Sequence, residues 1–153
     1  MLIIGGNPLA SNGSIMTAPN MRQKLKDIKA RNGKVVVIDP RRTETVDIAS
    51  EHHFIRPATD VLLLLAMLNE IYVQGYAKKA QTNNRAVTLA PEIERLADFV
   101  KDYSAESVAD ITGITAIEIQ RLVKEFCEAQ SSVCYGRICT RMWLIESISD
   151  YGD

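Results

Sequence analysis

Short apolar runs alternate with segments of helical periodicity along the first third of the chain. Residues 1–4 (MLII) and 34–38 (KVVVI) form continuous runs, typical of strands buried on both faces of a parallel sheet. Between them, Met21, Leu25 and Ile28 recur at helical spacing in a basic segment. The pattern therefore predicts a βαβ unit with a right-handed crossover.

Turn residues mark the predicted ends of these elements. The dipeptide Asn32-Gly33 is expected to end the helix of residues 20–31, because glycine accepts the left-handed conformation just past a helix C-terminus. A third short strand is predicted at residues 53–55. The loop of residues 56–60 then leads into the next helix.

The rest of the chain is predicted to be mainly helical. Residues 61–73 are apolar nearly all round, so this helix is expected to be central, with Thr59 or Asp60 as its cap. Residues 77–90 are polar and unpatterned, which indicates a linker or surface loop. Further elements are predicted from Pro91 to about Tyr103, from a Ser104 cap to Gly113, from a Thr115–Glu118 capping box onward, and at residues 132–135 as a strand.

Together these elements predict an α/β fold. We expect a Rossmann-like three-layer domain with a mostly parallel sheet and a helical C-terminal part. Residues 1–137 are assigned to this domain, with its helical portion at about residues 91–130. The sequence contains no internal repeat that would indicate a solenoid instead.

Composition narrows the class of protein. The 153 residues are 46% hydrophobic and 24% charged, which is typical of one soluble domain and excludes a disordered chain. The longest apolar run, residues 61–68, is much shorter than the roughly 20 residues that cross a bilayer. Residues 1–6 lack the basic start of a secretory signal, and the three cysteines (Cys127, Cys134 and Cys139) favour a reducing compartment. We therefore expect a cytoplasmic protein without a membrane partner.

Charge is distributed unevenly along the chain. The 18 basic and 19 acidic residues give a net charge of −1. Residues 1–43 hold eight Lys or Arg against Asp27 and Asp39, a net charge of +6, so residues 44–153 sum to −7. The first third is therefore predicted to attract an anion, although the overall charge argues against nucleic acid as the partner.

Three loops, at residues 5–14, 39–43 and 56–60, each follow a predicted strand and lead towards a helix. In an open parallel sheet such loops converge on the crevice at the carboxyl ends of the strands, where ligands bind. Each loop taken alone is also typical of an ordinary turn or a solvated charge pair. Their joint placement favours a single nucleotide site.

The residue types in these loops suit a nucleotide. Gly5 and Gly6 allow a ligand to approach the backbone, Ser11 adds a hydroxyl group, and a following helix N-terminus favours phosphate. Arg41 or Arg42 can donate a forked pair of hydrogen bonds to phosphate. An aspartate carboxylate can accept hydrogen bonds from ribose hydroxyls or from the N1/N2 edge of guanine.

Longer segments of the sequence carry a family resemblance. They are GGNPLASNGS (5–14), VVVIDPRRTET (35–45) and HHFIRPATDVLLLLAMLNEI (52–71), and the similarity continues through residues 112–115 to residues 135–137. As a set, these motifs resemble the molybdopterin oxidoreductases of the dimethyl sulfoxide reductase family, which include formate dehydrogenases and nitrate reductases. Residues 138–153 form a divergent tail beyond the resemblance.

The resemblance implies a domain that binds the guanosine dinucleotide part of a molybdopterin guanine dinucleotide cofactor. Residues 5–12 would line the pyrophosphate and nearby pterin, residues 39–41 would contact the guanosine ribose and phosphates, and Thr59 with Asp60 would hold the guanine. The cofactor-binding residues carried over by motif are Gly5, Gly6, Asn7, Pro8, Ser11, Asn12, Asp39, Pro40, Arg41, Thr59 and Asp60.

The chain also departs from the family pattern. Where such family members usually have glycine between Pro57 and Thr59, this chain has Ala58, which would strain the loop if its φ is positive. The iron–sulfur segment and the residue that ligates molybdenum or tungsten are expected upstream of residue 1, and further domains of a parent enzyme would be partners. We therefore predict no catalytic or metal-ligating residue in this chain and no turnover by the chain alone.

A helix-turn-helix DNA-binding module is the main alternative. Residues 104–129 have the pattern of two helices joined by a glycine turn, but their net charge is −3. A recognition helix would instead present basic or amide side chains to DNA. We therefore expect no nucleic-acid partner. A free-standing carrier of a nucleotide or cofactor tail is a third possibility, with poor affinity because half of the cofactor's enclosing surface would be missing.

The pair His52-His53 invites a metal-binding or acid–base role. Adjacent residues on a strand point to opposite faces, so the two rings cannot share one ligand geometry. We expect a structural role for both.

Overall fold

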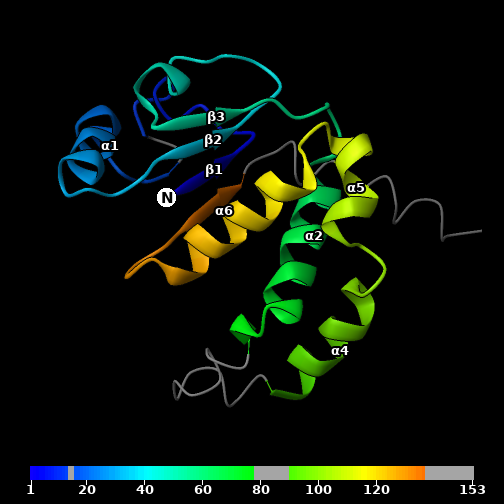
Figure 1. Ribbon diagram of the computed structural model, residues 1–153. Helices are drawn as coiled ribbons and strands as arrows, with labels where there is room; N and C mark the ends of the chain where they lie inside the picture. The colour runs from blue at the N-terminus through cyan, green and yellow to red at the C-terminus, as the bar shows by residue number, and fades with distance from the viewer. Residues whose placement is uncertain (14–15, 78–89, 137–153) are drawn as a thin grey trace, which may run out of the picture. The chain divides into compact units, whose positions relative to one another are not determined.

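The structure is a computed structural model that describes residues 1–13, 16–77 and 90–136. The chain divides into two compact units, the first made of Met1–Asp60 with Ser131–Asp153 and the second of Val61–Gln130. Figure 1 labels most of the helices and strands of both units. The assignment of residues 1–137 to one domain stays a prediction.

The first unit contains a parallel sheet of four strands. These are β1 (Leu2–Ile4), β2 (Val36–Ile38), β3 (Glu51–His53) and β4 (Cys134–Gly136), in the spatial order β3-β2-β1-β4. Each neighbouring pair is parallel, with Ile3 opposite both Val37 and Tyr135. The predicted α/β class and the predicted parallel sheet are confirmed (Figure 1).

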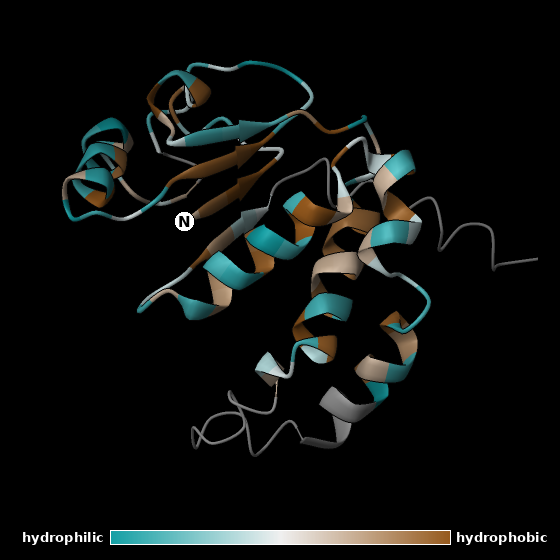
Figure 2. Ribbon diagram, viewed as in Figure 1, coloured by the Kyte–Doolittle hydropathy of each residue, from teal (hydrophilic) through white to brown (hydrophobic). Residues whose placement is uncertain are grey.

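Helix α1 (Met21–Ala30) packs its apolar side chains onto one face of this sheet. Met21 and Leu25 share a buried cluster with Ile3 and Val37, which point to the same face because side chains alternate along a strand. Figure 2 shows β1 and β2 as hydrophobic and β3 as hydrophilic. The central strands thus supply the core, and β3 occupies an edge.

The third strand lies two residues earlier than the sequence predicts. It spans Glu51–His53 instead of residues 53–55, because its register follows β2, with Val37 opposite His52. Phe54, which the apolar pattern placed in the strand, is 62% exposed. The position of this edge strand is set by backbone pairing with β2, and an edge strand tolerates polar side chains. The apolar pattern therefore placed β3 at the wrong residues.

The end of α1 also differs in detail from the expectation. Asn32 takes the left-handed conformation, with a φ of 60°, whereas Gly33 does not. A Cβ atom at Gly33 would lie 2.7 Å from the carbonyl oxygen of Ile28. Glycine is therefore suited to this position because the backbone passes close to the last turn of the helix, while asparagine supplies the left-handed residue.

The second unit is helical in the part that the structure describes. It contains most of α2 (Asp60–Val73), with α4 (Ala90–Val100), α5 (Ala105–Thr112) and α6 (Ala116–Glu128). The Ser104 cap and the Thr115–Glu118 capping box form as predicted. Helix α4 ends at Val100, three residues before the predicted end at Tyr103.

Some expectations lie outside the described residues. Residues 78–89 hold most of the predicted linker, and residues 138–153 are the divergent tail. Among the helices that the structure does describe, none has the length and apolar character needed to span a membrane.

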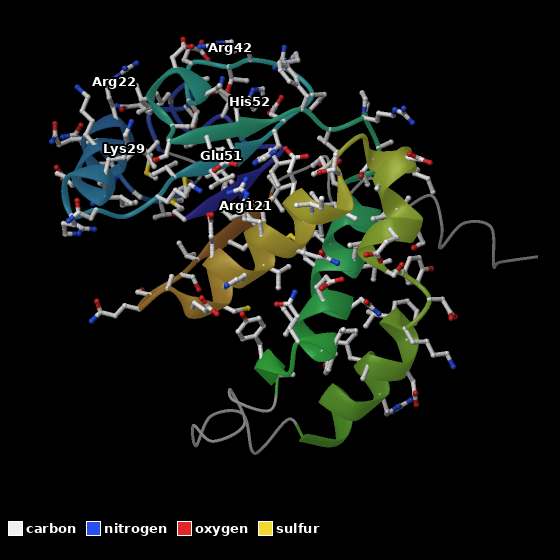
Figure 3. The ribbon with its side chains drawn as sticks, viewed as in Figure 1. Arg22, Lys29, Arg42, Glu51, His52 and Arg121 are labelled. Carbon is white, nitrogen blue, oxygen red and sulfur yellow. The ribbon has the colours of Figure 1, made fainter. Side chains whose placement is uncertain are left out.

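A single turn of 3-10 helix, η1 (Val46–Ile48), connects β2 to β3. The ammonium group of Lys29 on α1 donates hydrogen bonds to the carbonyl oxygens of Ile48, at 3.0 Å, and Ala49, at 3.3 Å. Figure 3 labels Lys29 and the neighbouring basic residue Arg22. A cation near the end of η1 satisfies carbonyl groups that the helix leaves unpaired.

Candidate functional site

Three loops leave the same edge of the sheet in the first unit. Because β1, β2 and β3 are neighbours and parallel, the residues that follow each strand start from the carboxyl edge. The amide of Gly5 donates to the carbonyl of Ile38 at 2.9 Å, and the amide of Asp39 donates to the carbonyl of His53 at 3.2 Å. The loops therefore begin side by side, as the sequence predicts.

The first loop is shaped by close backbone packing. Gly5 has a φ of 59°, and a Cβ atom at Gly6 would lie 3.2 Å from side-chain atoms of both Ile3 and Tyr135. Within residues 5–13, the amides of Gly6, Asn7 and Ser11 donate to no acceptor in the described parts of the chain. These N–H groups remain available to an anion.

Two other predicted residues of this loop serve its own turns. The Ser11 hydroxyl donates to the carbonyl of Pro8 at 3.4 Å, a long hydrogen bond within the loop. Asn12 has a φ of 47° and its amide donates to the carbonyl of Leu9. The Ser11 side chain and the Asn12 backbone therefore both take part in the turns of the loop itself.

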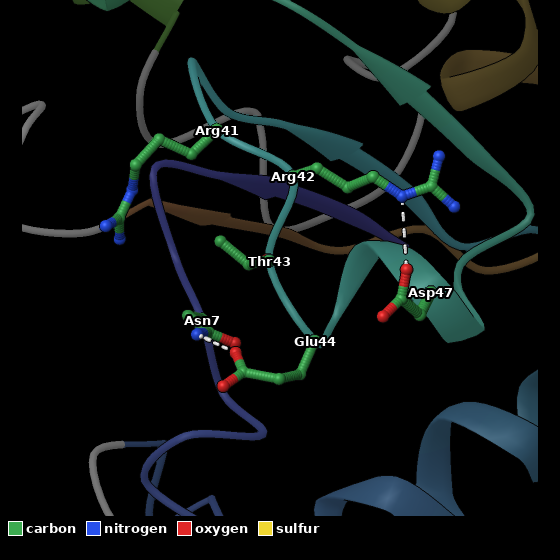
Figure 4. Close-up of a pocket in the computed structure, with 6 residues that line it drawn as sticks. All are labelled: Asn7, Arg41, Arg42, Thr43, Glu44 and Asp47. Carbon is green, nitrogen blue, oxygen red and sulfur yellow. Dashed lines mark hydrogen bonds and ion pairs between the residues drawn. The ribbon is translucent and has the colours of Figure 1, made fainter.

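A pocket of about 430 Å³ opens between the first loop and the segment after β2 (Figure 4). Its lining residues are Asn7, Arg41, Arg42, Thr43, Glu44 and Asp47. Arg42 pairs with Asp47 at 3.2 Å, while Arg41 extends in the opposite direction. Asn7 and Arg41 are the two predicted cofactor residues that the pocket brings together.

Asp39 organises the turn that follows β2. It is 7% exposed, and its Oδ1 accepts a hydrogen bond from the amide of Arg41 at 2.8 Å. Its own carbonyl contacts Nε2 of His52 at 3.0 Å. Asp39 thus fixes the direction in which Pro40 and Arg41 leave the sheet, and its second carboxylate oxygen can accept a further hydrogen bond.

The two histidines have separate partners, as the strand geometry predicts. His52 contacts the carbonyl of Asp39, and His53 contacts a carboxylate oxygen of Glu51 at 2.6 Å. Lys34 also pairs with Glu51, at 2.7 Å. In the described ranges, no three His, Cys, Asp or Glu side chains gather as metal ligands.

Asp60 is the most unusual ionisable group of the candidate site. It is only 3% exposed, and its Oδ1 has no hydrogen-bond partner among the described residues. Burial raises the pKa of its carboxyl and the charge of Asp39 raises it further, while a backbone hydrogen bond partly offsets both. A buried acceptor without a donor is rare in native proteins, so this oxygen is a candidate contact for a ligand that presents a donor.

The turn before Asp60 is unusual in its backbone. Ala58 has a φ of 65°, so an alanine occupies the left-handed region that favours glycine. Thr59 donates through its hydroxyl to the carbonyl of Arg56 at 2.7 Å. The hydroxyl of Thr59 is therefore engaged in the turn, and Asp60 is left as the acceptor.

Sequence reasoning did not select Thr43, Glu44 or Thr45, which the structure places beside the predicted residues. Thr43 lines the pocket, is 7% exposed, and its hydroxyl has no partner in the described part of the chain. Glu44 and Thr45 both hydrogen-bond to Asn7. They lie within the motif of residues 35–45, but their residue types did not single them out, because threonine and glutamate are ordinary loop residues.

Comparison with known proteins identifies relatives. No protein-family model matches the chain. It is 30% identical over 132 residues to formate dehydrogenase H of Escherichia coli, covering 86% of this chain and 17% of the relative. It is 31% identical over 142 residues to the molybdopterin-containing subunit ArrA of an arsenate respiratory reductase from Chrysiogenes arsenatis, covering 80% and 16%. The chain is a homologue of one segment of the molybdopterin oxidoreductases.

A solved structure supports the same relationship. Acetylene hydratase from Pelobacter acetylenicus matches with a TM-score of 0.70 and 26% identity, over 91% of this chain and 18% of that one. The chain thus spans about a sixth of the length of the molybdopterin oxidoreductases that it matches. The predicted resemblance to this family is confirmed.

The two helices and the glycine turn that the DNA-binding alternative requires are present in this homologue of the molybdopterin oxidoreductases. Helices α5 and α6 are joined through Gly113, which has a φ of 81°. Glu106, Asp110 and Glu125 are exposed on this pair of helices. Their negative charge opposes a DNA backbone, so neither the geometry nor the named relatives favour DNA binding.

Proposed function

We propose that the carboxyl edge of β1, β2 and β3 binds the guanosine diphosphate part of a molybdopterin guanine dinucleotide cofactor. The chain would act as one segment of a molybdenum or tungsten oxidoreductase, with further domains of that enzyme as partners. The observation that carries the proposal is the buried Oδ1 of Asp60, which has no donor among the described residues. The relationship to molybdopterin oxidoreductases supports it.

Guanine fits the chemistry of Asp60. Its N1–H and N2 amino groups are neutral donors on one edge, and a carboxylate accepts two parallel hydrogen bonds. Burial raises the pKa of Asp60 because the ionised form lacks solvation in the free protein. A ligand that supplies donors would stabilise the ionised carboxylate, so the site selects a donor edge and disfavours a second anion.

The phosphates fit the first loop and Arg41. The amides of Gly6, Asn7 and Ser11 have no acceptor in the described residues. The guanidinium of Arg41 forms no hydrogen bond or ion pair there either. Backbone N–H groups and a guanidinium are a common combination for holding diphosphate. The free oxygen of Asp39 would accept from a ribose hydroxyl, as in other dinucleotide sites.

The buried Thr43 hydroxyl adds a further donor at the pocket. Because it has no partner among the described residues, it can donate to a phosphate oxygen without breaking an existing hydrogen bond. The cofactor, when bound, would supply the metal-centred redox chemistry of the enzyme. The residues of this chain would hold its nucleotide end, and we assign none of them to the catalytic step.

Titration of the chain with guanosine diphosphate tests the proposal. Calorimetry should detect binding, and amide chemical shifts should move at Asn7, Asp39 and Asp60. Adenosine diphosphate is the matched control, because adenine presents an acceptor at N1 where guanine presents a donor. Shifts confined to residues 104–129, or equal affinity for the two nucleotides, would contradict guanine recognition at this edge.

The variant Asp60→Asn makes this test more specific, because it should weaken nucleotide binding while it stabilises the ligand-free chain. It should weaken guanosine diphosphate binding about tenfold or more, since a charged acceptor is lost. It should also raise the free energy of unfolding of the ligand-free chain at pH 7. A carboxyl whose pKa is raised by folding contributes stability below its unfolded pKa, and that stability is lost as pH rises through the folded pKa. Urea unfolding should therefore separate variant from parent at pH 7 and much less near pH 4.

A further inference from the structure

The side chain of Asn7 joins two segments that are far apart in sequence. Its Nδ2 donates to Oε2 of Glu44 at 2.6 Å, and its Oδ1 accepts from the hydroxyl of Thr45 at 2.7 Å. The Thr45 oxygen also accepts from the amide of Leu9 at 3.3 Å. Glu44 and Thr45 therefore hydrogen-bond to the first loop at Asn7 and Leu9, and Figure 4 shows the contact between Asn7 and Glu44. We name these four residues the Asn7 clamp.

Only one orientation of the Asn7 side-chain amide forms all of the hydrogen bonds of the clamp. The backbone N–H of Leu9 donates to the Thr45 oxygen, and the Thr45 hydroxyl donates its own hydrogen to Oδ1 of Asn7. An ionised carboxylate can only accept, so Glu44 must face the Asn7 amino group. Reversing the Asn7 amide would place its oxygen against the Glu44 carboxylate, two acceptors without a hydrogen between them. The clamp thus fixes the rotamer and the orientation of Asn7 together.

Burial and charge both maintain the clamp without a ligand. Thr45 is fully buried, at 0% exposed, so its hydroxyl has no competing water. The hydrogen bond from Asn7 is the main cause that lowers the pKa of the Glu44 carboxyl, and the charges of Arg41 and Arg22 act in the same direction. Glu44 therefore stays ionised and continues to accept from Asn7 at neutral pH.

We infer that Glu44 and Thr45 are positioning residues for the anion-binding loop. By holding Asn7 and Leu9, they keep residues 5–13 in the conformation that leaves the amides of Gly6, Asn7 and Ser11 free. The loop is then ordered before the ligand arrives, and the ligand does not lose affinity to ordering it. The ligand part of this inference rests on the proposed function, whereas the ordering of the loop does not.

The Thr45→Val variant removes the hydroxyl and keeps the shape of the side chain. In the ligand-free chain, hydrogen exchange at the Leu9 amide should become at least about tenfold faster than in the parent, relative to the amides of β1. Binding of guanosine diphosphate should weaken by about tenfold. Thr45→Ser keeps the hydroxyl and should restore both properties, which a merely steric role of the methyl group would not produce.

Thr112→Val is the matched control. Thr112 is also 0% exposed, and its hydroxyl oxygen accepts from the amide of Ile114 at 3.3 Å, the same distance as in the clamp. It lies in the other unit, on α5. This variant should lower stability as Thr45→Val does, yet leave Leu9 exchange relative to β1 and nucleotide affinity unchanged.

The exchange measurement tests whether the clamp orders the loop, and the binding measurement tests whether that order helps the nucleotide to bind. If Thr45→Val accelerates Leu9 exchange no more than exchange in β1, the clamp does not order the loop and the inference is overturned. If the parent binds guanosine diphosphate and Thr45→Val binds it equally well, the positioning role is overturned. If the parent does not bind the nucleotide, the proposed function fails, and the exchange result alone still decides whether the clamp orders the loop.

Discussion

Ala58 has a backbone conformation that its side chain disfavours. Its φ of 65° lies in the left-handed region, where the Cβ of an L-residue is crowded by the following carbonyl oxygen. Members of the family that the sequence resembles usually have glycine at this position. The sequence therefore predicts a strained loop if the φ of Ala58 is positive, and the structure has a positive φ there. The strain lies two residues before Asp60, in the loop that presents the proposed guanine acceptor.

Replacing Ala58 by glycine should relieve this strain. We expect Ala58→Gly to raise the free energy of unfolding by about 0.5–1 kcal/mol, because relief of the crowding outweighs the added chain entropy of the unfolded state. Chemical denaturation measures the difference. Ala97→Gly, inside α4, is the control and should lower stability by about 1 kcal/mol. A loss of stability in both variants would mean that the loop around Ala58 is not strained.

The residue types that could be assigned from sequence are those whose chemistry is specific. An arginine pair after a strand and an aspartate before a helix are each ordinary, and only their joint placement at one edge of the sheet points to an anion and to a donor edge. Thr43 and Thr45 could not be selected in this way. Their importance depends on burial, at 7% and 0% exposed, and on the direction of one hydroxyl, which no local pattern encodes.

At the scale of elements, the sequence is most informative where an apolar run or a cap has a local cause. Strands β1 and β2 follow from continuous apolar runs, and α6 follows from its capping box. Strand β3 was misplaced because its position is set by pairing with residues of β2 that lie 15 positions earlier in the chain, such as Ile38 opposite His53. Pairing between separate segments cannot be read from the periodicity of either one.

The end of α1 provides an element-scale prediction. Gly33→Ala should lower the free energy of unfolding by more than about 1 kcal/mol, because its Cβ would meet the backbone oxygen of Ile28 at 2.7 Å. Asn32→Gly should leave stability equal or slightly higher, since Asn32 already has a φ of 60°. Thermal unfolding of both variants checks the assignment. If the costs were reversed, the helix would end through a left-handed glycine, as the sequence alone predicted.

At the scale of the whole molecule, charge separates along the chain. The net charge of −1 hides +6 in residues 1–43 and −7 in the remainder. The charge of Lys29 is not neutralised by its partners, because it donates to backbone carbonyls, whereas Arg42 forms an ion pair with Asp47. The positive charges of Arg41 and Arg22 both help to lower the pKa of the Glu44 carboxyl. A polyanionic ligand is therefore expected to meet a positive field at residues 1–43 despite the net negative charge of the chain.

This separation predicts a specific salt dependence. Binding of guanosine diphosphate should weaken severalfold as ionic strength rises from about 0.05 to 0.5 M, because exposed charges are screened over a shorter distance. Arg41→Ala should weaken binding about tenfold at low salt and flatten the dependence, since a charge-assisted contact to phosphate is lost. Arg41→Lys keeps the charge but not the forked geometry, so it should retain the salt dependence with lower affinity.

Lys124→Ala is the control for this series. Lys124 is exposed on α6 in the other unit, so its removal changes the net charge by the same amount without touching the proposed site. Titration calorimetry at several salt concentrations should show parent-like affinity and slope for this variant. Equal effects of Arg41→Ala and Lys124→Ala would mean that the nucleotide responds only to overall charge, because a specific phosphate contact depends on where the cation lies.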